Sequence, residues 1–416
     1  MTPVTPAPPS RGSVIGVLRD GAWLTAERAR AYGWILLWTT IAIGAAWVLF
    51  SRAGLDPSGK PLGADFTSFW SASRLALGGA PAGAYDMPVH HAQEVMVVGR
   101  DTGYAAFFYP PIFLLVCLPL ATLPYLASLA VWLALTGVAY WRMARAWLGE
   151  AFGAMPIFAF PAVFTNIGHG QNGFLSAALF GGGALWLERR PILAGVCLGA
   201  LAYKPHLGLL IPFALAIAGR WKSFAAAAAT VIALAAASLG LFGPDAWRGF
   251  IADSGLARLA LEQGLVGNAK MQSAFAAVRL WGGGLALAYA AQTGVAVFAM
   301  GGLVWLRRRA PGSAAEGPAM IVAAVLTSPF LLDYDLVILA APLAWMLREG
   351  ARKGFLNWEK TTLAAAFALP LVSRTLATQA HLPLAPLVMV MLFLLVLKRA
   401  GHDAAAVRAD DAPRVM

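Results

Sequence analysis

Five long stretches without a single Asp, Glu, Lys or Arg are the feature that most constrains this chain of 416 residues. Each stretch reaches the ~20 residues that an α-helix needs to cross the ~30 Å hydrocarbon core of a bilayer. Because 59% of the residues are hydrophobic and only 12% are charged, a water-soluble protein is excluded. Backbone groups in lipid must be hydrogen-bonded internally, so the sequence predicts an all-α polytopic membrane protein. The stretches are residues 31–51, 102–141, 151–187, 223–244 and 280–306.

The basic residues divide the loops into two groups. With the N-terminus inside, seven segments on one side hold 21 of the 31 Lys and Arg residues but only ten of the 20 acids. The other side includes two long loops, residues 51–106 and 243–279, and carries no net charge. Lys and Arg favour cytoplasmic loops, so we expect a multi-pass protein of the inner (plasma) membrane whose long loops face the periplasm or exterior. The basic segments are residues 1–31, 142–150, 188–190, 219–222, 307–317, 348–360 and 398–416.

The number of spans depends on residues 102–141. These 40 residues are long enough for two spans broken at Leu123-Pro124, whereas the charge sorting needs an odd number of crossings. Either Phe107–Leu120 is partly re-entrant, or a later hairpin is assigned to the wrong side. We therefore predict about 12 spans, within a range of about 11 to 13. The predicted division is a cytoplasmic tail at 1–32, a transmembrane domain at 33–397 and a cytoplasmic tail at 398–416.

The first outer loop contains a helical pattern rather than a random linker. Apolar residues at i, i+3 and i+4 spacing predict an amphipathic helix that lies in the membrane interface and ends at Gly78-Gly79. A second short amphipathic helix is predicted at residues 89–98. The pair is expected to cover the outer mouth of a helix bundle. The first pattern consists of Phe66, Phe69, Trp70 and Ser73–Leu77.

Asp65 directly precedes the first of these helices. An ionisable group beside hydrocarbon is costly and usually has a function. One reading is an N-cap that accepts from the amides of Thr67 or Ser68. The other is a general base at the boundary between membrane and water, and the two roles are compatible.

Two more polar groups lie at predicted outer span ends. The turn at residues 166–172 places Gln171 and Asn172 at the start of the next helix, where they could contact a substrate. Lys204 and His206 follow a short apolar stretch. Lys204 either snorkels toward water or, with His206, provides a cation for an anionic phosphate ester at headgroup depth.

The segment Asp333-Tyr334-Asp335 forms another polar outer hairpin. Its two carboxylates could accept hydrogen bonds from sugar hydroxyls. They could also bind a divalent cation through oxygen, but two ligands are few for such a site. We therefore expect no metal and no other cofactor.

These features, in this order, resemble glycosyltransferase family 87, a group of polyprenol-phosphate-mannose-dependent membrane transferases with the GT-C fold. No single motif is specific, whereas their order and spacing are. The resemblance covers about residues 33–350. It is carried by Asp65-Phe66 with Trp70, Gly78, Tyr85-Asp86, Tyr109-Pro110-Pro111, Gly170-Gln171-Asn172, the stretch from Gly195 to Lys204, Gln272-Ser273, Ser328-Pro329 and Tyr334-Asp335.

The resemblance implies a GT-C-type bundle that transfers a hexose, typically mannose, from a polyprenyl-phosphate carrier to an acceptor hydroxyl on the outer face. The acceptor would belong to a glycan or a glycolipid. Asp65 matches the catalytic base, and a single base without a second carboxylate predicts inversion at the anomeric carbon. With the polar groups above, the candidate substrate-binding residues are Tyr85, Asp86, Tyr109, Gln171, Asn172, Lys204, His206, Gln272, Ser273, Tyr334 and Asp335.

A permease or flippase for a lipid-linked sugar is the alternative. It would also have acids and cations in a cavity, but transporters place them near the midplane between internal repeats. This sequence places them at span ends on one side and shows no convincing repeat, which favours the transferase. The expected partners are the lipid-linked donor, the acceptor and membrane lipids. Nucleic acid is not expected, because cytoplasmic loops account for the net charge of +11.

Overall fold

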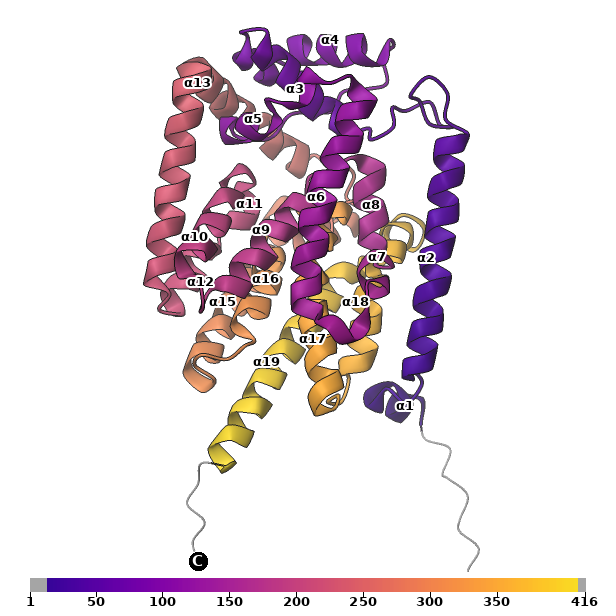
Figure 1. Ribbon diagram of the computed structural model, residues 1–416, viewed down its shortest axis with the longest axis vertical. Coiled ribbons are helices and arrows are strands. Elements are labelled where there is room, and N and C mark those ends of the chain that lie inside the picture. Colours follow the sequence, from indigo (N-terminus) through magenta and orange to yellow (C-terminus); the bar gives the residue numbers. More distant parts are fainter. Residues whose placement is uncertain (1–12, 411–416) are drawn as a thin grey trace, which may run out of the picture.

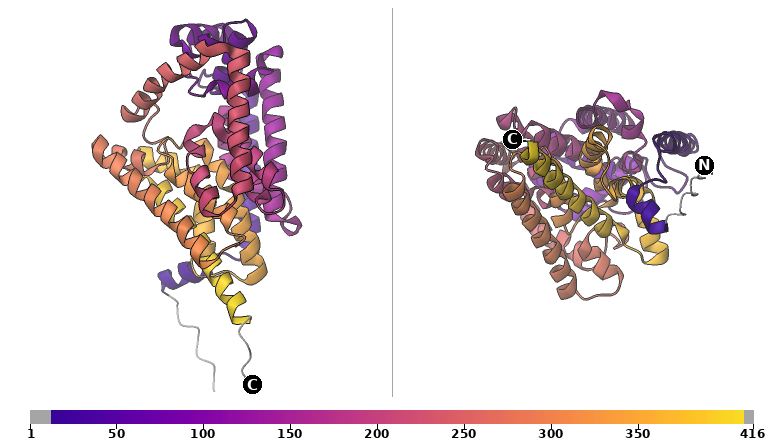
Figure 2. Two further views of the ribbon diagram at one scale, coloured as in Figure 1. Left: turned by 90° about the vertical axis from the view of Figure 1, so that its left-hand side faces the viewer. Right: turned by 90° about the horizontal axis from the view of Figure 1, so that it is seen from below.

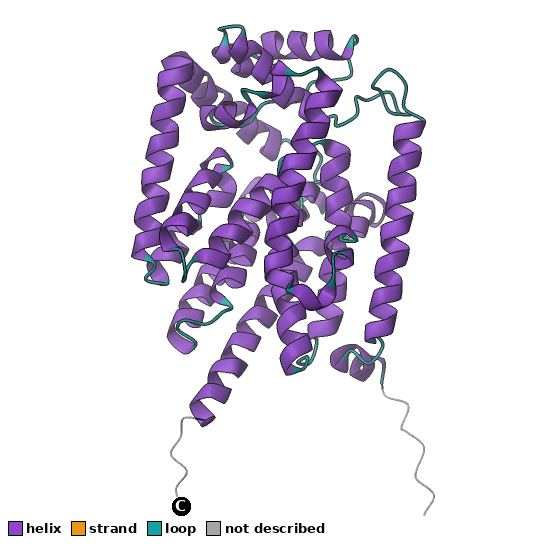
Figure 3. Ribbon diagram, in the orientation of Figure 1, coloured by secondary structure: helices purple, strands orange, loops and turns teal. Residues whose placement is uncertain are grey.

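The computed structural model describes residues 13–410, so the first and last parts of the two predicted tails lie outside the described residues. The described chain is helical, as Figure 3 shows, and no β-strand occurs between residues 13 and 410. Its first part contains α1 (Val14–Asp20), α2 (Ala26–Leu49), α3 (Phe66–Leu77), η1 (Pro81–Tyr85), α4 (Met87–Val98), α5 (Pro111–Cys117), η2 (Leu120–Thr122) and α6 (Tyr125–Leu148).

The remainder contains a run of shorter helices up to Ile217, followed by a part that includes most of the long ones. The middle part contains η3 (Glu150–Phe152), α7 (Met155–Phe158), α8 (Pro161–His169), α9 (Gly173–Trp186), α10 (Pro191–Ala200), η4 (Leu201–Tyr203), α11 (Pro205–Gly208), α12 (Ile211–Ile217) and α13 (Trp221–Glu262). The last part contains α14 (Ala274–Leu280), α15 (Leu285–Arg309), α16 (Glu316–Thr327), η5 (Asp333–Leu339), α17 (Ala340–Lys353), α18 (Glu359–Ala380) and α19 (Leu384–Asp410).

Five of these helices are long and apolar enough to cross a membrane: α2, α6, α13, α15 and α19. Several other apolar helices have only 10–17 residues, among them α9 and α16. The chain is therefore a helical membrane protein, and the count of twelve spans stays a prediction. α2 begins at Ala26 rather than at residue 33, because the Thr25 side chain caps it by accepting from the Arg28 amide. α19 continues into the predicted C-terminal tail.

The segment Phe107–Leu120 does not cross the molecule. At its start the Tyr109 hydroxyl donates to Gln171, and near its end the Ser73 hydroxyl of α3 donates to the Leu118 carbonyl. Both contacts lie at the same end of the bundle, so the segment enters and leaves from one side. This arrangement fits the re-entrant alternative, and α6 is the one helix of this stretch that is long and apolar enough to cross a membrane.

Within residues 13–410, the parts of the seven basic segments lie together at the other end of the molecule. Arg220 contacts both Glu188 and Glu316, which joins three of them. Further contacts join the rest: Arg408 with the Arg309 carbonyl, Lys353 with Asp403, the Trp358 amide with the Arg19 carbonyl, and Arg348 beside Gly149. Figure 1 shows α1 and the end of α19 at this basic end, opposite α3 and α4. The predicted grouping of the loops is therefore confirmed, whereas the side that faces the cytoplasm stays a prediction.

The layer at the end opposite the basic segments, called the outer layer after the predicted topology, is built from the two long loops. α3, η1, α4 and α5 cover the top of the bundle (Figure 1), and the second part of α13 turns across it (Figure 2). The turn in α13 occurs at Gly243, whose φ of 74° is left-handed, and at Pro244, which has no amide hydrogen. Both predicted helices of the first outer loop are present as α3 and α4.

Aromatic packing fixes the position of α3. The Phe69 ring lies 5.1 Å from the ring of Phe113 in α5 and 6.1 Å from that of Trp132 in α6. All three side chains are buried. The apolar face of α3 therefore packs on the protein's own bundle rather than on lipid, and the residue that precedes α3 is held at the top of the bundle.

Candidate active site

Asp65 is not the helix cap that the sequence suggested. Its backbone is in the helical region, with φ −78° and ψ −18°, and its side chain makes no capping hydrogen bond. A capping side chain needs a more extended backbone to fold back over the first turn. The carboxylate is instead directed toward the turn after α8, whose His169 carbonyl accepts from the Asp65 amide at 3.1 Å.

One glycine allows this turn to approach α3 closely. Gly170 has a φ of +65°, and a Cβ atom there would lie 2.8 Å from the Phe66 Cβ atom and 3.1 Å from the Gly63 Cα atom. Any larger residue would push the turn away from α3. Gly170 therefore places the side chains on either side of it beside Asp65.

Three side chains surround the Asp65 carboxylate. Gln171 Nε2 donates to Asp65 Oδ2 over 3.1 Å, and His169 Nδ1 lies 3.3 Å from the same oxygen. Lys270 Nζ lies 3.8 Å from it. Burial alone would raise the pKa of Asp65, but His169 and the positive charge of Lys270 outweigh it and hold this pKa well below its ordinary value. The carboxylate is therefore ionised, and with a quarter of its side chain exposed it can accept a hydrogen bond from a substrate.

Lys204 lies beside this group, and other residues of the protein enclose its ammonium. Its ammonium donates to Asp335 Oδ1 over 2.5 Å and to Asn172 Oδ1 over 2.9 Å, and the Lys204 side chain is only 2% exposed. It also lies 5.0 Å from the centre of the Tyr334 ring. The structure thus brings together four residues that the sequence analysis selected. A role for Lys204 in phosphate binding stays a prediction, because its ammonium already has two acceptors.

A continuous hydrogen-bonded path joins this ion pair to Asp65. Gln171 Oε1 accepts from the Asn172 amide at 3.1 Å and from the Tyr109 hydroxyl at 3.4 Å, while its Nε2 donates to Asp65. Asn172 then accepts from Lys204. Segments from five parts of the chain meet here: the start of α3, the residues before α5, the α8–α9 turn, the end of η4 and the start of η5.

Lys270 and His169 were not selected from the sequence. His169 lies in the polar turn that was selected, but no role was given to it. Lys270 lies in the second outer loop, and this loop is joined to the late hairpin because the Gln272 amide donates to the Leu331 carbonyl at 2.7 Å. The only signal in the sequence was a basic residue two positions before the Gln272-Ser273 motif.

Tyr85 and Asp86 lie outside the network. The Tyr85 hydroxyl donates to the Tyr109 carbonyl at 3.0 Å and therefore supports Tyr109 rather than Asp65. Asp86 is exposed and caps α4 by accepting from the Val89 amide at 3.2 Å. Tyr109 itself is buried, and its hydroxyl reaches the network by donating to Gln171.

The remaining selected residues have structural partners. Ser273 caps α14 by accepting from the Ala276 amide at 3.1 Å, and Gln272 Nε2 donates to the Lys270 carbonyl at 3.1 Å. The His206 ring packs against the Phe330 ring with 6.2 Å between centres. The first two residues shape the loop that carries Lys270, whereas His206 makes no contact with Asp65.

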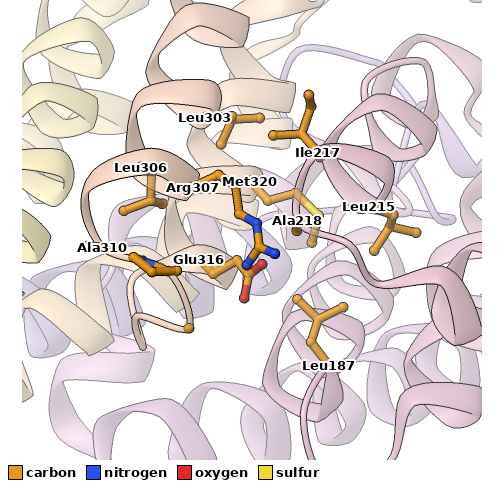
Figure 4. Close-up of a pocket in the computed structure, with 13 residues that line it drawn as sticks. Leu187, Leu215, Ile217, Ala218, Leu303, Leu306, Arg307, Ala310, Glu316 and Met320 are labelled. Carbon is orange, nitrogen blue, oxygen red and sulfur yellow. The ribbon is translucent and has the colours of Figure 1, made fainter.

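Two cavities lie away from this network. The one in Figure 4 is at the basic end, near Arg307 and Glu316, and its volume of about 20 Å³ leaves room for about one water molecule. The other, of about 680 Å³, opens between the end of α3, η1 and the kink of α13. The 12-residue helix α3 separates this second cavity from Asp65 by about 18 Å. Neither cavity is lined by a carboxylate with amide, histidine and lysine side chains around it, as Asp65 is.

The arrangement suits chemistry on a hydroxylated, anionic molecule. An ionised carboxylate is partly exposed, amide side chains surround it, and a second cation lies at its edge. Such a set can take a proton from a hydroxyl group and hold a negatively charged leaving group.

Comparison with known proteins agrees with this chemistry. The model of glycosyltransferase family 87 matches residues 107–332, which is more than half of the chain. The match includes Gln171, Lys204 and Lys270, while Asp65 precedes it. A search of curated proteins and a search of solved structures found no match. The breadth of the family match shows that this helical membrane protein belongs to glycosyltransferase family 87.

Proposed function

We propose that this glycosyltransferase moves a hexose from a polyprenyl-phosphate carrier to a hydroxyl group of a glycan or glycolipid. Mannose is the hexose that we propose. The reaction takes place on the extracytoplasmic face of the inner (plasma) membrane and inverts the anomeric centre. The observation that carries the proposal is the position of the Asp65 network: Asp65 directly precedes α3, which lies at the end of the bundle opposite α1 and the end of α19 (Figure 1). By the positive-inside bias, the network faces away from the cytoplasm.

A lipid-linked sugar has the chemistry that this end of the molecule can recognise. Its prenyl chain stays in the bilayer, its phosphate lies at headgroup depth and its sugar projects into water. The network offers a cation, amides and a carboxylate at that depth. A nucleotide sugar has no such access, because it is made in the cytoplasm and an ion crosses hydrocarbon only at a high free-energy cost.

Asp65 acts as the base. The acceptor oxygen attacks the anomeric carbon while its proton passes to the Asp65 carboxylate. The bond from the anomeric carbon to the phosphate oxygen breaks, and the electron pair leaves with the phosphate. Gln171 orients the carboxylate through the 3.1 Å hydrogen bond. Attack from the face opposite the phosphate, with one base and no covalent intermediate, gives inversion.

The proposed architecture is a GT-C-type bundle with about twelve crossings. The re-entrant segment at residues 107–120 supports this count, because it gives the odd number of crossings that the charges require between the first outer loop and Arg142. The short helices, such as α9 and α10, would cross as shortened spans held within the protein.

The donor class can be tested with purified protein in carrier-free lipid. We expect transfer of radiolabelled mannose from polyprenyl-phosphate-mannose to mixed membrane lipids or glycans, and none from GDP-mannose or UDP-hexoses, because only the lipid donor reaches Asp65. Proton NMR of the product should show an anomeric configuration opposite to that of the donor. Efficient transfer from a nucleotide sugar without carrier lipid, or retention of configuration, would overturn the proposal.

A further inference from the structure

We propose that Lys270 is the ligand of the donor phosphate, and that it leaves Asp65 when the donor binds. The proposal rests on the proposed function and deepens it. It names the cation for the leaving group and links donor binding to release of the base.

The backbone on both sides of Lys270 is held in place. Met271 forms a bridge with Leu332, and the Gln272 amide donates to the Leu331 carbonyl. The Lys270 amide donates to the Gly267 carbonyl at 3.0 Å. The base of the Lys270 side chain is therefore fixed above the late hairpin, while its flexible four-carbon stem remains free to swing.

The Lys270 ammonium is the more available of the two lysine cations in the network. In the part of the chain that the structure describes, it makes no hydrogen bond, and its contacts are Asp65 Oδ2 at 3.8 Å and the Tyr334 ring at 5.8 Å. The Lys270 side chain is 17% exposed, compared with 2% for Lys204. Lys204 would have to leave two acceptors in a buried site to bind a phosphate, whereas Lys270 would leave one loose contact.

Donor phosphate and Asp65 compete for the same cation. Without donor, Lys270 stabilises the charged carboxylate, and this opposes the protonation of Asp65 that the reaction needs. A phosphate placed beside Lys270 draws the ammonium away and leaves Asp65 with Gln171 and His169. Asp65 thereby becomes a stronger base only when a donor is present.

The same movement places positive charge where the reaction needs it. As the bond from the anomeric carbon breaks, the phosphate gains one negative charge on the departing oxygen. Lys270 stabilises this charge and keeps its own protons, while the acceptor proton goes to Asp65. The products are the glycosylated acceptor, polyprenyl phosphate and protonated Asp65, which later loses its proton to water.

The first test measures donor binding in three variants reconstituted in nanodiscs with polyprenyl-phosphate-mannose. Lys270→Met should raise the donor Kd and KM by about 10- to 100-fold, which is the usual effect of losing a charge-assisted contact. Lys270→Arg should restore most of the affinity because it keeps the charge. Lys60→Met removes another lysine from the same long loop as Asp65, where the side chain is exposed and is not one of the three that surround the Asp65 carboxylate, and it should bind like the wild type.

The second test examines the competition itself. Asp65→Asn removes the charge that holds Lys270, so it should bind donor about 2- to 5-fold more tightly than the wild type although it turns over slowly. The same substitution in the Lys270→Met background should leave donor affinity unchanged. A merely structural role for Lys270 would not produce this coupling.

The outcomes separate this inference from the proposed function. Wild-type protein that neither binds nor uses polyprenyl-phosphate-mannose would contradict the proposed function. Active wild-type protein with an unchanged donor Kd in folded Lys270→Met would contradict the role of Lys270 alone. An equal Asp65→Asn effect with and without Lys270 would contradict the competition.

Discussion

Asp65→Asn is expected to lower kcat by about 10²–10⁴-fold, the usual contribution of a positioned acid or base. The substitution keeps an oxygen that can accept from Gln171 but removes the ability to take a proton from the acceptor. Since Asp65 does not cap α3, no helix-capping hydrogen bond is lost, and the protein should fold normally. Single-turnover transfer from a saturating lipid donor measures the effect without a contribution from donor affinity.

A matched control is available on the same outer loop. Asp86 is exposed and caps α4, and asparagine is an equally good cap. Asp86→Asn should therefore keep both fold and turnover. Near-normal turnover of Asp65→Asn would remove Asp65 from the role of base.

Lys204→Met is expected to lower the free energy of unfolding by about 3–5 kcal/mol, because it leaves the Asp335 carboxylate buried without its partner. Both side chains are at most 2% exposed, so water cannot replace the lost ammonium. The double variant Lys204→Met with Asp335→Leu should recover much of the loss, since a buried ion pair can often be replaced by apolar groups. Thermal unfolding in detergent, followed by circular dichroism, compares the three proteins.

The control for this experiment is an exposed pair. Arg248 and Asp245 are both 74% exposed, so Arg248→Met should change stability by less than about 1 kcal/mol. Wild-type stability in Lys204→Met, combined with weaker donor binding, would contradict the structural role. It would return Lys204 to the phosphate role suggested by the sequence.

The sequence predicted the grouping of the loops well because that grouping depends on a bias summed over many residues. No single contact was needed to place Arg220 and Glu316 at one end. The helix from Phe66 to Leu77 was also predictable, since its apolar spacing is local and two glycines follow it. The same pattern could not show that α3 packs on Trp132 rather than on lipid.

The details of the active site depend on contacts that local patterns do not contain. The capping role of Asp65 was wrong because it depends on one backbone angle, which the neighbouring α8–α9 turn influences. The pairing of Lys204 with Asp335 joins residues 131 positions apart. Lys270 lies in a loop without periodicity, and its partner Asp65 is on the other long loop. Both lysines were visible as charges, but only the fold distinguishes the paired one from the available one.

The central claim is that the end of the bundle around Asp65 faces the outside of the cell, where a lipid carries the sugar to it. The most direct measurement is labelling of intact cells with a membrane-impermeant maleimide, with Cys117 and Cys197 replaced by alanine. Ser58 is exposed on the loop that leads to Asp65, and Ala314 is exposed at the basic end. We predict that Ser58→Cys is labelled in intact cells and that Ala314→Cys is labelled only after lysis. The reverse pattern would place Asp65 in the cytoplasm and contradict both the site's orientation and its lipid-linked donor.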